Sequence, residues 1–320
     1  MAYTAGDPIL DDEYNTFVNN SSSPFGYNHF AGTGSGEYGL GQSHIATVSA
    51  GDTINASHWN TLFTGMDTIA NHTNDTMTSR AAVSAGDTIA IKAAVEADLA
   101  TLAASVAGGS VNATALTDAD QGTSTNSGTW RSSSTIERSV TFASADAMRH
   151  FFNAGGVIKV DPGTSGTTTG AKDDAYSSLT GAIGVLSLKA HSTSIAGDGG
   201  ETQTSFDSSN GFFDLGTSYT SKIKYNSTDY TSNYSTNFIE ISMKLNAAQG
   251  SATVLTIKQF TQDTIGDTTY QSGNLEGTPT DQNDVPAMSM NVVASEPTSA
   301  QGLASAIQVS SNAQVSNSAS

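Results

Sequence analysis

A short segment, Ala-Gly-Asp followed by one further residue and Ile, occurs three times near the start of the chain and divides it into similar stretches. The copies occupy residues 5–9, 50–54 and 85–89, and Val-Ser precedes the second and the third. Glycine permits turns that other residues resist, and Asp can accept hydrogen bonds from the free N–H groups of a starting helix. Because each copy precedes a stretch of helical character, residues 1–115 are predicted to form a helical attachment and oligomerisation region.

The stretch after the second copy carries apolar side chains three to five residues apart, which is the spacing of one face of a helix. Two interpretations stay open. A common turn-and-helix start is used three times, or a duplicated module packs its helices around an oligomer axis. Tyr14-Asn15 and Trp59-Asn60 lie at matching offsets and favour duplication. On that interpretation the candidate assembly contacts are Trp59, Leu62, Phe63, Met66 and Ile69.

The remainder of the chain is predicted to be mainly β. Residues 116–135 are small and polar and are predicted to form a linker. Short alternating segments with polar turns follow, which is typical of strands, and one or two short helices are expected among them. The predicted fold class is α+β, mainly β, with a jelly-roll-like β-sandwich over residues 136–295. Residues 296–320 are predicted to form a low-complexity tail that is disordered alone or adds to a neighbouring subunit. The strand candidates include Gly211–Leu215, Tyr219–Tyr225, Asn237–Leu245 and Ala252–Phe260.

The chain is unusually poor in charge, and its balance is acidic. Only 13% of the residues are charged, about half the usual share for a soluble domain, so Ser, Thr, Asn and Gly must supply solubility. The formal net charge of −18 repels phosphate backbones and argues against nucleic-acid binding. No segment predicts membrane insertion, and the lack of cysteine excludes disulfides and Cys-ligated zinc. The first residues lack the features of a signal peptide, so we expect the protein to leave the host inside a particle.

The chemistry-bearing residues form no recognisable catalytic or cofactor pattern. Gly34, Gly36 and Gly39 form a GxGxxG sequence, but no apolar strand precedes it, so a surface loop is expected rather than a nucleotide site. The six histidines are scattered, and His58 and His72 are predicted to be solvent-facing or interfacial rather than metal ligands. Neighbouring acidic residues at 11–13 and 173–174 are explained by helix starts. We therefore predict no enzyme activity, no cofactor and no metal. A glycan-cleaving depolymerase is kept as a third hypothesis, after a structural role and a role in binding a receptor or glycan.

One cluster of aromatic residues suggests recognition. Tyrosines alternate with Asn, Ser and Thr in the stretch SYTSKIKYNSTDYTSNYST. Tyrosine rings stack on apolar faces and amides bond hydroxyls, a combination common on glycan- and protein-binding surfaces. The alternative is that they lie at strand edges and turns. The candidate surface-recognition residues are Tyr219, Tyr225, Tyr230 and Tyr234.

Three stretches carry a resemblance to a known class of proteins. They are YTAGDPILDDEYNTFVN, then GTGSGEYGLGQ with VSAGDTINASHWNTLFTGMDTIANHTN, and finally RSVTFASADAMRHFFNAGGVIKV with SNYSTNFIEISMKLN. Together they resemble virion structural proteins of tailed bacteriophages of marine bacteria, cyanophages in particular. The resemblance implies a tail, fibre or appendage component located in the virion. It carries over no catalytic residue.

The partners expected from these observations are further copies of the chain and other virion proteins. We favour a homo-oligomer, a trimer in the first instance. A host surface glycan or receptor is an alternative partner, and a capsid decoration or filament-forming protein is a variant of the same hypothesis. No nucleic acid is expected among the partners.

Overall fold

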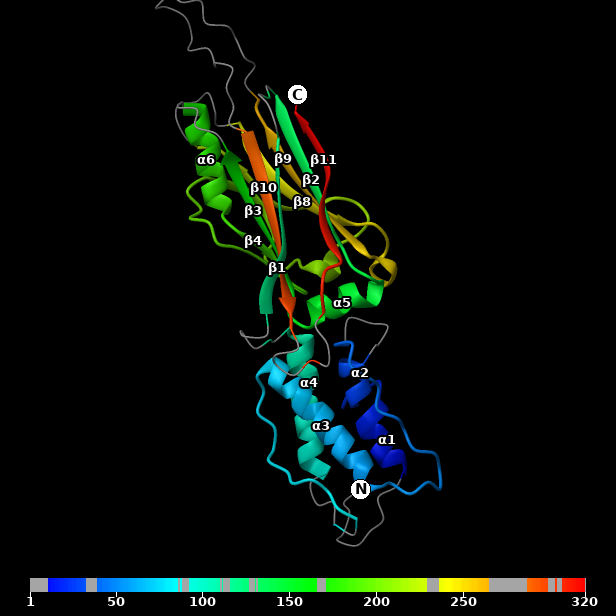
Figure 1. Cartoon of the computed structure of the whole chain (residues 1–320). Helices are drawn as coiled ribbons and strands as arrows, with labels where there is room; N and C mark the ends of the chain where they lie inside the picture. Colours follow the sequence, from blue (N-terminus) through cyan, green and yellow to red (C-terminus); the bar gives the residue numbers. More distant parts are fainter. Residues whose placement is uncertain are drawn as a thin grey trace, which may run out of the picture. The chain divides into compact units, whose positions relative to one another are not determined.

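The computed structural model shows a mixed α and β protein with two antiparallel sheets (Figure 1). The chain divides into two compact units. The helical unit comprises Met1–Thr117, Asp146–Gly156 and Glu296–Gln308, and the strand unit comprises Asp118–Ala145, Val157–Ser295 and Val309–Ser320. The structure describes residues 11–32, 39–85, 87, 92–109, 111, 116–126, 130, 132–165, 171–228, 236–264, 287–298, 303 and 307–319.

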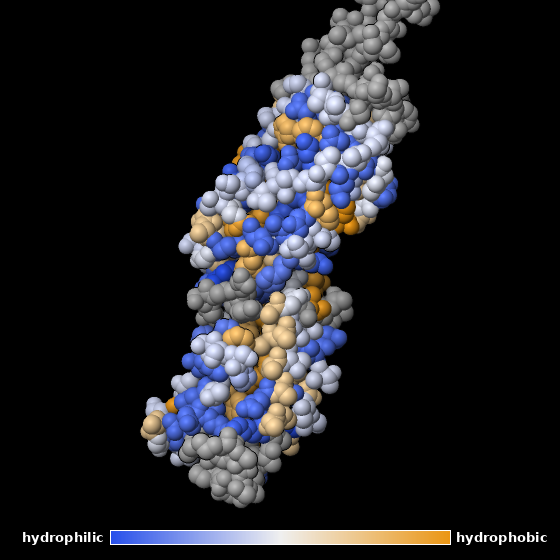
Figure 2. All heavy atoms as spheres, turned by 180° about the vertical axis from the view of Figure 1, so that it is seen from behind, coloured by the Kyte–Doolittle hydropathy of each residue, from blue (hydrophilic) through white to orange (hydrophobic). Residues whose placement is uncertain are grey.

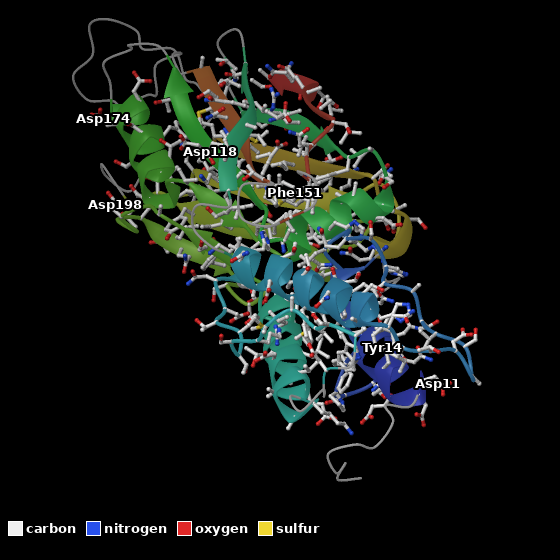
Figure 3. All side chains as sticks on the ribbon, turned by 60° about the horizontal axis from the view of Figure 1, so that its bottom comes forward. Asp11, Tyr14, Asp118, Phe151, Asp174 and Asp198 are labelled. Atoms are coloured by element: carbon white, nitrogen blue, oxygen red, sulfur yellow. The ribbon has the colours of Figure 1, made fainter. Side chains whose placement is uncertain are left out.

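The helical unit is built around aromatic residues from its first helices. These helices are α1 (Asp11–Asn19), α2 (Tyr27–Ala31), α3 (Ala56–Thr73) and α4 (Lys92–Ala107). Tyr14 points from α1 toward α3 (Figure 3), where its ring meets Trp59 edge-on at 5.7 Å. Phe17 and Phe63 each lie 5.8 Å from the Trp59 ring. All four rings are at most 5% exposed, so this aromatic cluster forms the core of the unit.

Asparagine side chains hold two extended segments against the helices. Asn15 donates from Nδ2 to the Val48 carbonyl at 2.8 Å and accepts from the Val48 N–H at 2.9 Å. Asn60 makes the same pair of bonds to Val83, at 2.9 and 2.8 Å. Asn28 binds Ile45 in the same way. These extended segments belong to no sheet. The asparagine amides therefore make the hydrogen bonds that a neighbouring strand would otherwise make to their backbone.

The Asp of the repeated segment closes a turn instead of starting a helix. Asp52 accepts a hydrogen bond from the Ser49 N–H and donates its own N–H to the Ser49 carbonyl, at 3.0 and 2.9 Å. Asp87 and Ser84 repeat this arrangement. Gly51 lies inside the turn with φ of 90°, a conformation that favours glycine. The prediction that Asp receives the first helical N–H groups was therefore wrong, because α3 begins four residues later at Ala56.

The strand unit contains both sheets and one long helix. The five-stranded sheet has the order β1-β10-β3-β4-β5, and the six-stranded sheet has the order β11-β2-β9-β8-β7-β6. The strands of the first are β1 (Leu116–Thr125), β10 (Ala287–Pro297), β3 (Val157–Ser165), β4 (Leu186–Leu188) and β5 (Thr193–Ile195). Those of the second are β11 (Ser311–Ala319), β2 (Ser133–Thr141), β9 (Val254–Gln262), β8 (Phe238–Leu245), β7 (Thr220–Asn226) and β6 (Thr202–Phe206).

Strands β2 and β9 alternate as half-buried strands should. In β9 every second side chain, from Leu255 to Thr261, is buried and its neighbours are partly exposed. Helix α6 (Ala171–Ile183) contacts β3 of one sheet and β7 and β8 of the other. Its Tyr176 is fully buried, meets Trp130 edge-on at 5.3 Å, and donates to the Gln262 carbonyl. The helix thus ties the two sheets together through apolar contact.

Several expected boundaries differ from those in the structure. The predicted linker contains β1 and the start of β2. Helix α5 (Ala145–Asn153), expected within the sandwich, groups with the helical unit, where Asn153 donates to the Gly39 carbonyl. The strand candidate Gly211–Leu215 contains a single 3-10 turn, Phe212–Asp214. Part of the predicted tail forms β11, which pairs with β2 of its own chain.

Candidate functional site

The partly exposed face of the six-stranded sheet gathers lysines and aromatic rings, and we name it the lysine–aromatic face. It is formed by the residues that alternate with the buried ones on β2, β9, β8 and β7. Lys258 on β9 lies opposite Ser242 of β8 on one side and Glu137 of β2 on the other. Lys244 lies opposite Thr256, so the two lysines are diagonal neighbours on adjacent strands.

The ammonium groups of this face lie over aromatic rings. Lys244 and Lys258 lie 4.3 and 4.1 Å from the centre of the Tyr219 ring. Lys224 lies 3.6 Å from the centre of the Phe238 ring, which in turn packs 5.8 Å from Phe260. Such contacts contribute about 0.5–1 kcal/mol each at exposed sites. The rings therefore hold the cations in place without neutralising them.

Tyr219 is anchored at its hydroxyl end. Its hydroxyl donates to Glu137 Oε1 at 2.6 Å, while Ser316 of β11 donates to Glu137 Oε2 at 2.9 Å. Burial, and then the hydrogen bond to the Glu137 carboxylate, raise the pKa of Tyr219, so the phenol stays protonated and donates at neutral pH. This hydrogen bond fixes the ring beside the two lysines and also occupies the carboxylate of Glu137, the residue opposite Lys258.

Four other cations of the described residues pair with carboxylates. Arg80 pairs with Asp98 and Asp67, Lys159 pairs with Asp118, Lys92 pairs with Glu13, and Arg149 pairs with Asp146. Within the described residues, Lys224, Lys244 and Lys258 have no carboxylate oxygen within 4 Å of the ammonium nitrogen. In a chain with 30 acidic and 12 basic residues, such unpaired cations on one face mark a surface suited to an anion.

The four candidate tyrosines have different surroundings. Tyr219 belongs to the lysine–aromatic face, as described. Tyr225 is only 3% exposed and its hydroxyl accepts from Gln203 Nε2 at 3.1 Å, so its ring is not part of an exposed surface. Tyr230 and Tyr234 lie outside the described residues. Lys244 and Lys258 were not among the predicted site residues, although they alternate with apolar residues in β8 and β9, a sequence signal that could have placed them on one face.

The candidate assembly contacts on α3 form the core of the helical unit. Trp59, Leu62, Phe63, Met66 and Ile69 are each at most 5% exposed within a single chain. They are therefore not available to another subunit. The prediction failed because an apolar stripe indicates burial but does not say whether the covering partner is the same chain or another one.

A different helix presents an uncovered apolar row. Helix α4 buries Val95, Leu99, Leu102 and Val106, and alanines occupy the opposite side. This alanine row comprises Ala93, Ala97, Ala100, Ala104 and Ala107, with alternating spacings of four and three residues. Figure 2 shows an apolar band along the helical unit. Exposed Glu96 and Thr101 flank the row, which itself consists of alanines alone.

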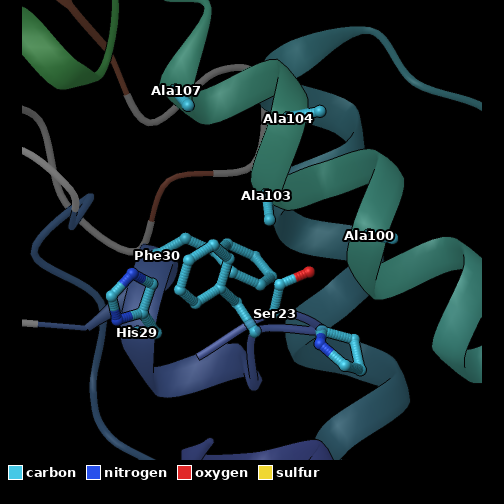
Figure 4. A pocket seen from close by; sticks show the side chains of 9 residues that line it. Ser23, His29, Phe30, Ala100, Ala103, Ala104 and Ala107 are labelled. Carbon is cyan, nitrogen blue, oxygen red and sulfur yellow. The ribbon is translucent and has the colours of Figure 1, made fainter. Parts of the chain in front are cut away.

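A hollow of about 240 Å³ adjoins the alanine row. Ala100, Ala103, Ala104 and Ala107 form one wall, and the loop before α2 with its first turn forms the other (Figure 4). On that second wall the rings of Phe25 and His29 stack in parallel at 4.1 Å. The hollow is apolar and holds no arrangement of acid and base groups, so it suits packing better than catalysis.

Two histidines of the helical unit are buried. His72 is fully buried, and its Nε2 lies 2.8 Å from the Ala154 carbonyl; the prediction that it is solvent-facing or interfacial was wrong. Burial lowers the pKa of His72. Burial also lowers the pKa of His150, with Asp146 opposing this shift. Both rings are therefore held neutral near pH 7 and serve packing.

The remaining chemistry-bearing groups are occupied by structural contacts or stand apart. Asp118 of β1 accepts from Lys159 and Ser295, and these bonds lower its pKa. Asp174 lies on α6, a separate element of the strand unit (Figure 3). Gly34 and Gly36 lie outside the described residues, and the Gly39 carbonyl accepts from Asn153. Among the described residues, no three His, Asp or Glu side chains are placed to hold a metal ion, and no helix is long and apolar enough to cross a membrane.

Comparison with protein-family models, curated proteins and solved structures finds no match for this chain.

Proposed function

We propose that this chain is a non-enzymatic structural component of a tailed-bacteriophage virion, and that it forms a homo-oligomer through helix α4. The resemblance of three stretches to virion proteins supports the setting. The observation that carries the assembly proposal is the uncovered alanine row. A trimer is the first arrangement to test, and a tail, fibre or other appendage is the proposed location.

The spacing of the alanine row favours a second helix as its occupant. Alternation of four and three residues gives an average of 3.5, the period at which one helix keeps the same face toward another. Alanine side chains allow close approach of helix backbones, and the row itself carries no charge. A second copy of α4 presents the same row, so copies of the helix can pack against one another around a common symmetry axis.

We further infer two finer features of the fold. The matching clamps at Asn15 and Asn60 support a duplicated module, because each residue occupies the same offset and binds the Val that precedes the next Ser-Ala-Gly-Asp turn. The single buried face of each sheet, together with the contacts of α6 to both, supports a jelly-roll-like β-sandwich.

The test is the mass of the protein in solution, measured by light scattering. Wild type is expected to be a discrete oligomer, and the double variant Ala100→Glu/Ala104→Glu is expected to be monomeric because it places charge in the row. Ser57→Glu/Thr61→Glu is the matched control, since it adds the same charges at the same spacing on exposed positions of α3. A monomeric wild type at high concentration, or equal behaviour of the two variants, would contradict assembly through α4.

A further inference from the structure

We propose that the lysine–aromatic face binds an acidic polysaccharide, with the ammonium groups of Lys224, Lys244 and Lys258 contacting its carboxylate or sulfate groups. This goes beyond the structural role and does not depend on the oligomer, because all the residues lie on one sheet of one chain. It names a ligand class for a surface on which sequence analysis singled out only Tyr219.

Lys244 and Lys258 are diagonal neighbours, and placing two like charges side by side is unfavourable unless something offsets it. Glu137 lies opposite Lys258 but accepts hydrogen bonds from Tyr219 and Ser316. Glu240 lies opposite Lys224, whose ammonium group sits over Phe238. An anion bridging the lysines would relieve their repulsion, so the face binds an anionic group better than a neutral one.

The net charge of −18 opposes the approach of any anion at long range. At physiological ionic strength the screening length is about 8 Å, so acidic residues elsewhere on the chain have little effect at this face. The local balance is three lysines against Glu137 and Glu240. Binding is therefore expected to be weak, local and sensitive to salt.

The side chains around the lysines favour a polysaccharide over a nucleic acid as the ligand. Short hydroxyl side chains surround the lysines, among them Thr135, Ser139 and Thr256 on the same face. Hydroxyl-rich surfaces with aromatic rings suit sugars. A nucleic acid carries a denser row of charges and would be repelled more strongly by the acidic chain.

The experiment measures binding of the full chain to dextran sulfate and to polygalacturonate, with unmodified dextran as the neutral probe. Wild type is expected to bind both polyanions, to ignore dextran, and to bind at least about tenfold more weakly when salt rises from 50 to 200 mM. Lys244→Gln/Lys258→Gln is expected to lose about tenfold or more in affinity. Lys244→Arg/Lys258→Arg is expected to retain binding, because arginine keeps the charge and also stacks on aromatic rings.

The matched control is Lys159→Gln/Lys189→Gln, which removes the same total charge elsewhere and should bind like wild type. Equal losses in the two Gln variants would show that net charge, not this face, governs binding, and would overturn the proposal. So would failure of wild type to bind either polyanion. Equally tight binding of a single-stranded DNA oligonucleotide would also overturn it, since the face would then recognise negative charge and not the chemistry of a polysaccharide. A monomeric wild type would refute assembly through α4 while leaving this result intact.

Discussion

Single asparagines carry much of the local order of the helical unit. Asn60 reaches from α3 to Val83 and both donates to and accepts from that backbone. Asn15 and Asn28 do the same for Val48 and Ile45. An amide is needed at each position, because a strand partner must be a donor and an acceptor at once. The extended segments around Ile45, Val48 and Val83 thus depend on side chains for bonds that a sheet would otherwise provide.

Replacing Asn60 by Asp tests this dependence. The carboxylate of Asn60→Asp can still accept from the Val83 N–H but cannot donate to the Val83 carbonyl, which it also repels. We expect a loss of about 1–3 kcal/mol in the free energy of unfolding, measured by urea denaturation. Asn71→Asp, an exposed position on the same helix, makes the same change in charge and should cost much less. Equal losses would show that the clamp contributes nothing specific.

At the level of elements, β11 is attached mainly by polar contacts. Asn312 accepts from Arg138 Nε at 3.0 Å and donates to the Val292 carbonyl at 2.8 Å, so it links the two sheets. Arg138 is 4% exposed and also donates to Ser124 Oγ. Its guanidinium lies in the strand unit among neutral acceptors. The strand therefore stabilises the unit by satisfying a buried cation, not by burying apolar side chains.

Asn312→Ala is expected to destabilise the strand unit by about 2–3 kcal/mol, because Arg138 loses a charge-assisted bond in a buried site. Asn317→Ala is the control on the same strand. Asn317 donates to the Thr125 carbonyl at an exposed site, and its loss should cost under about 1 kcal/mol. Urea unfolding of both variants measures the difference. If Asn317→Ala lowers the free energy of unfolding as much as Asn312→Ala, β11 is held by its backbone hydrogen bonds to β2 and not by the contact with Arg138.

The elements that could be predicted from sequence are those with an apolar period. The stripe from Trp59 to Ile69 predicted α3, and the strand candidates Asn237–Leu245 and Ala252–Phe260 predicted β8 and β9. Strands β1 and β11 were missed because their side chains are small, polar and mostly exposed. They pair through backbone and asparagine amides, which leave no hydrophobic pattern. The lysine–aromatic face was missed for a related reason. Its residues come from four strands, and the pattern of each strand in the sequence does not say which residues of the neighbouring strands lie opposite.

For the whole molecule, two effects of acid oppose each other. Lowering the pH from 7.5 to 5.5 protonates histidines and makes the net charge less negative, which weakens self-repulsion and favours the folded state. Burial of His72 and His150 acts in the other direction. Each has a folded-state pKa below its usual value, so the unfolded chain binds more protons. Stability then falls as the pH drops below the unfolded value, about 6.5.

We expect the buried histidines to dominate, because each can contribute up to about 1.4 kcal/mol per pH unit below that value, whereas repulsion between exposed charges is screened. The free energy of unfolding should therefore decrease between pH 6.5 and 5.5. His72→Gln should flatten this slope, since a neutral amide can still donate to the Ala154 carbonyl but does not titrate, and adding His150→Gln should flatten it further. Chemical denaturation at several pH values measures the slope. An increase in stability toward pH 5.5 in wild type would show that relief of the acidic net charge outweighs the cost of protonating the two buried rings.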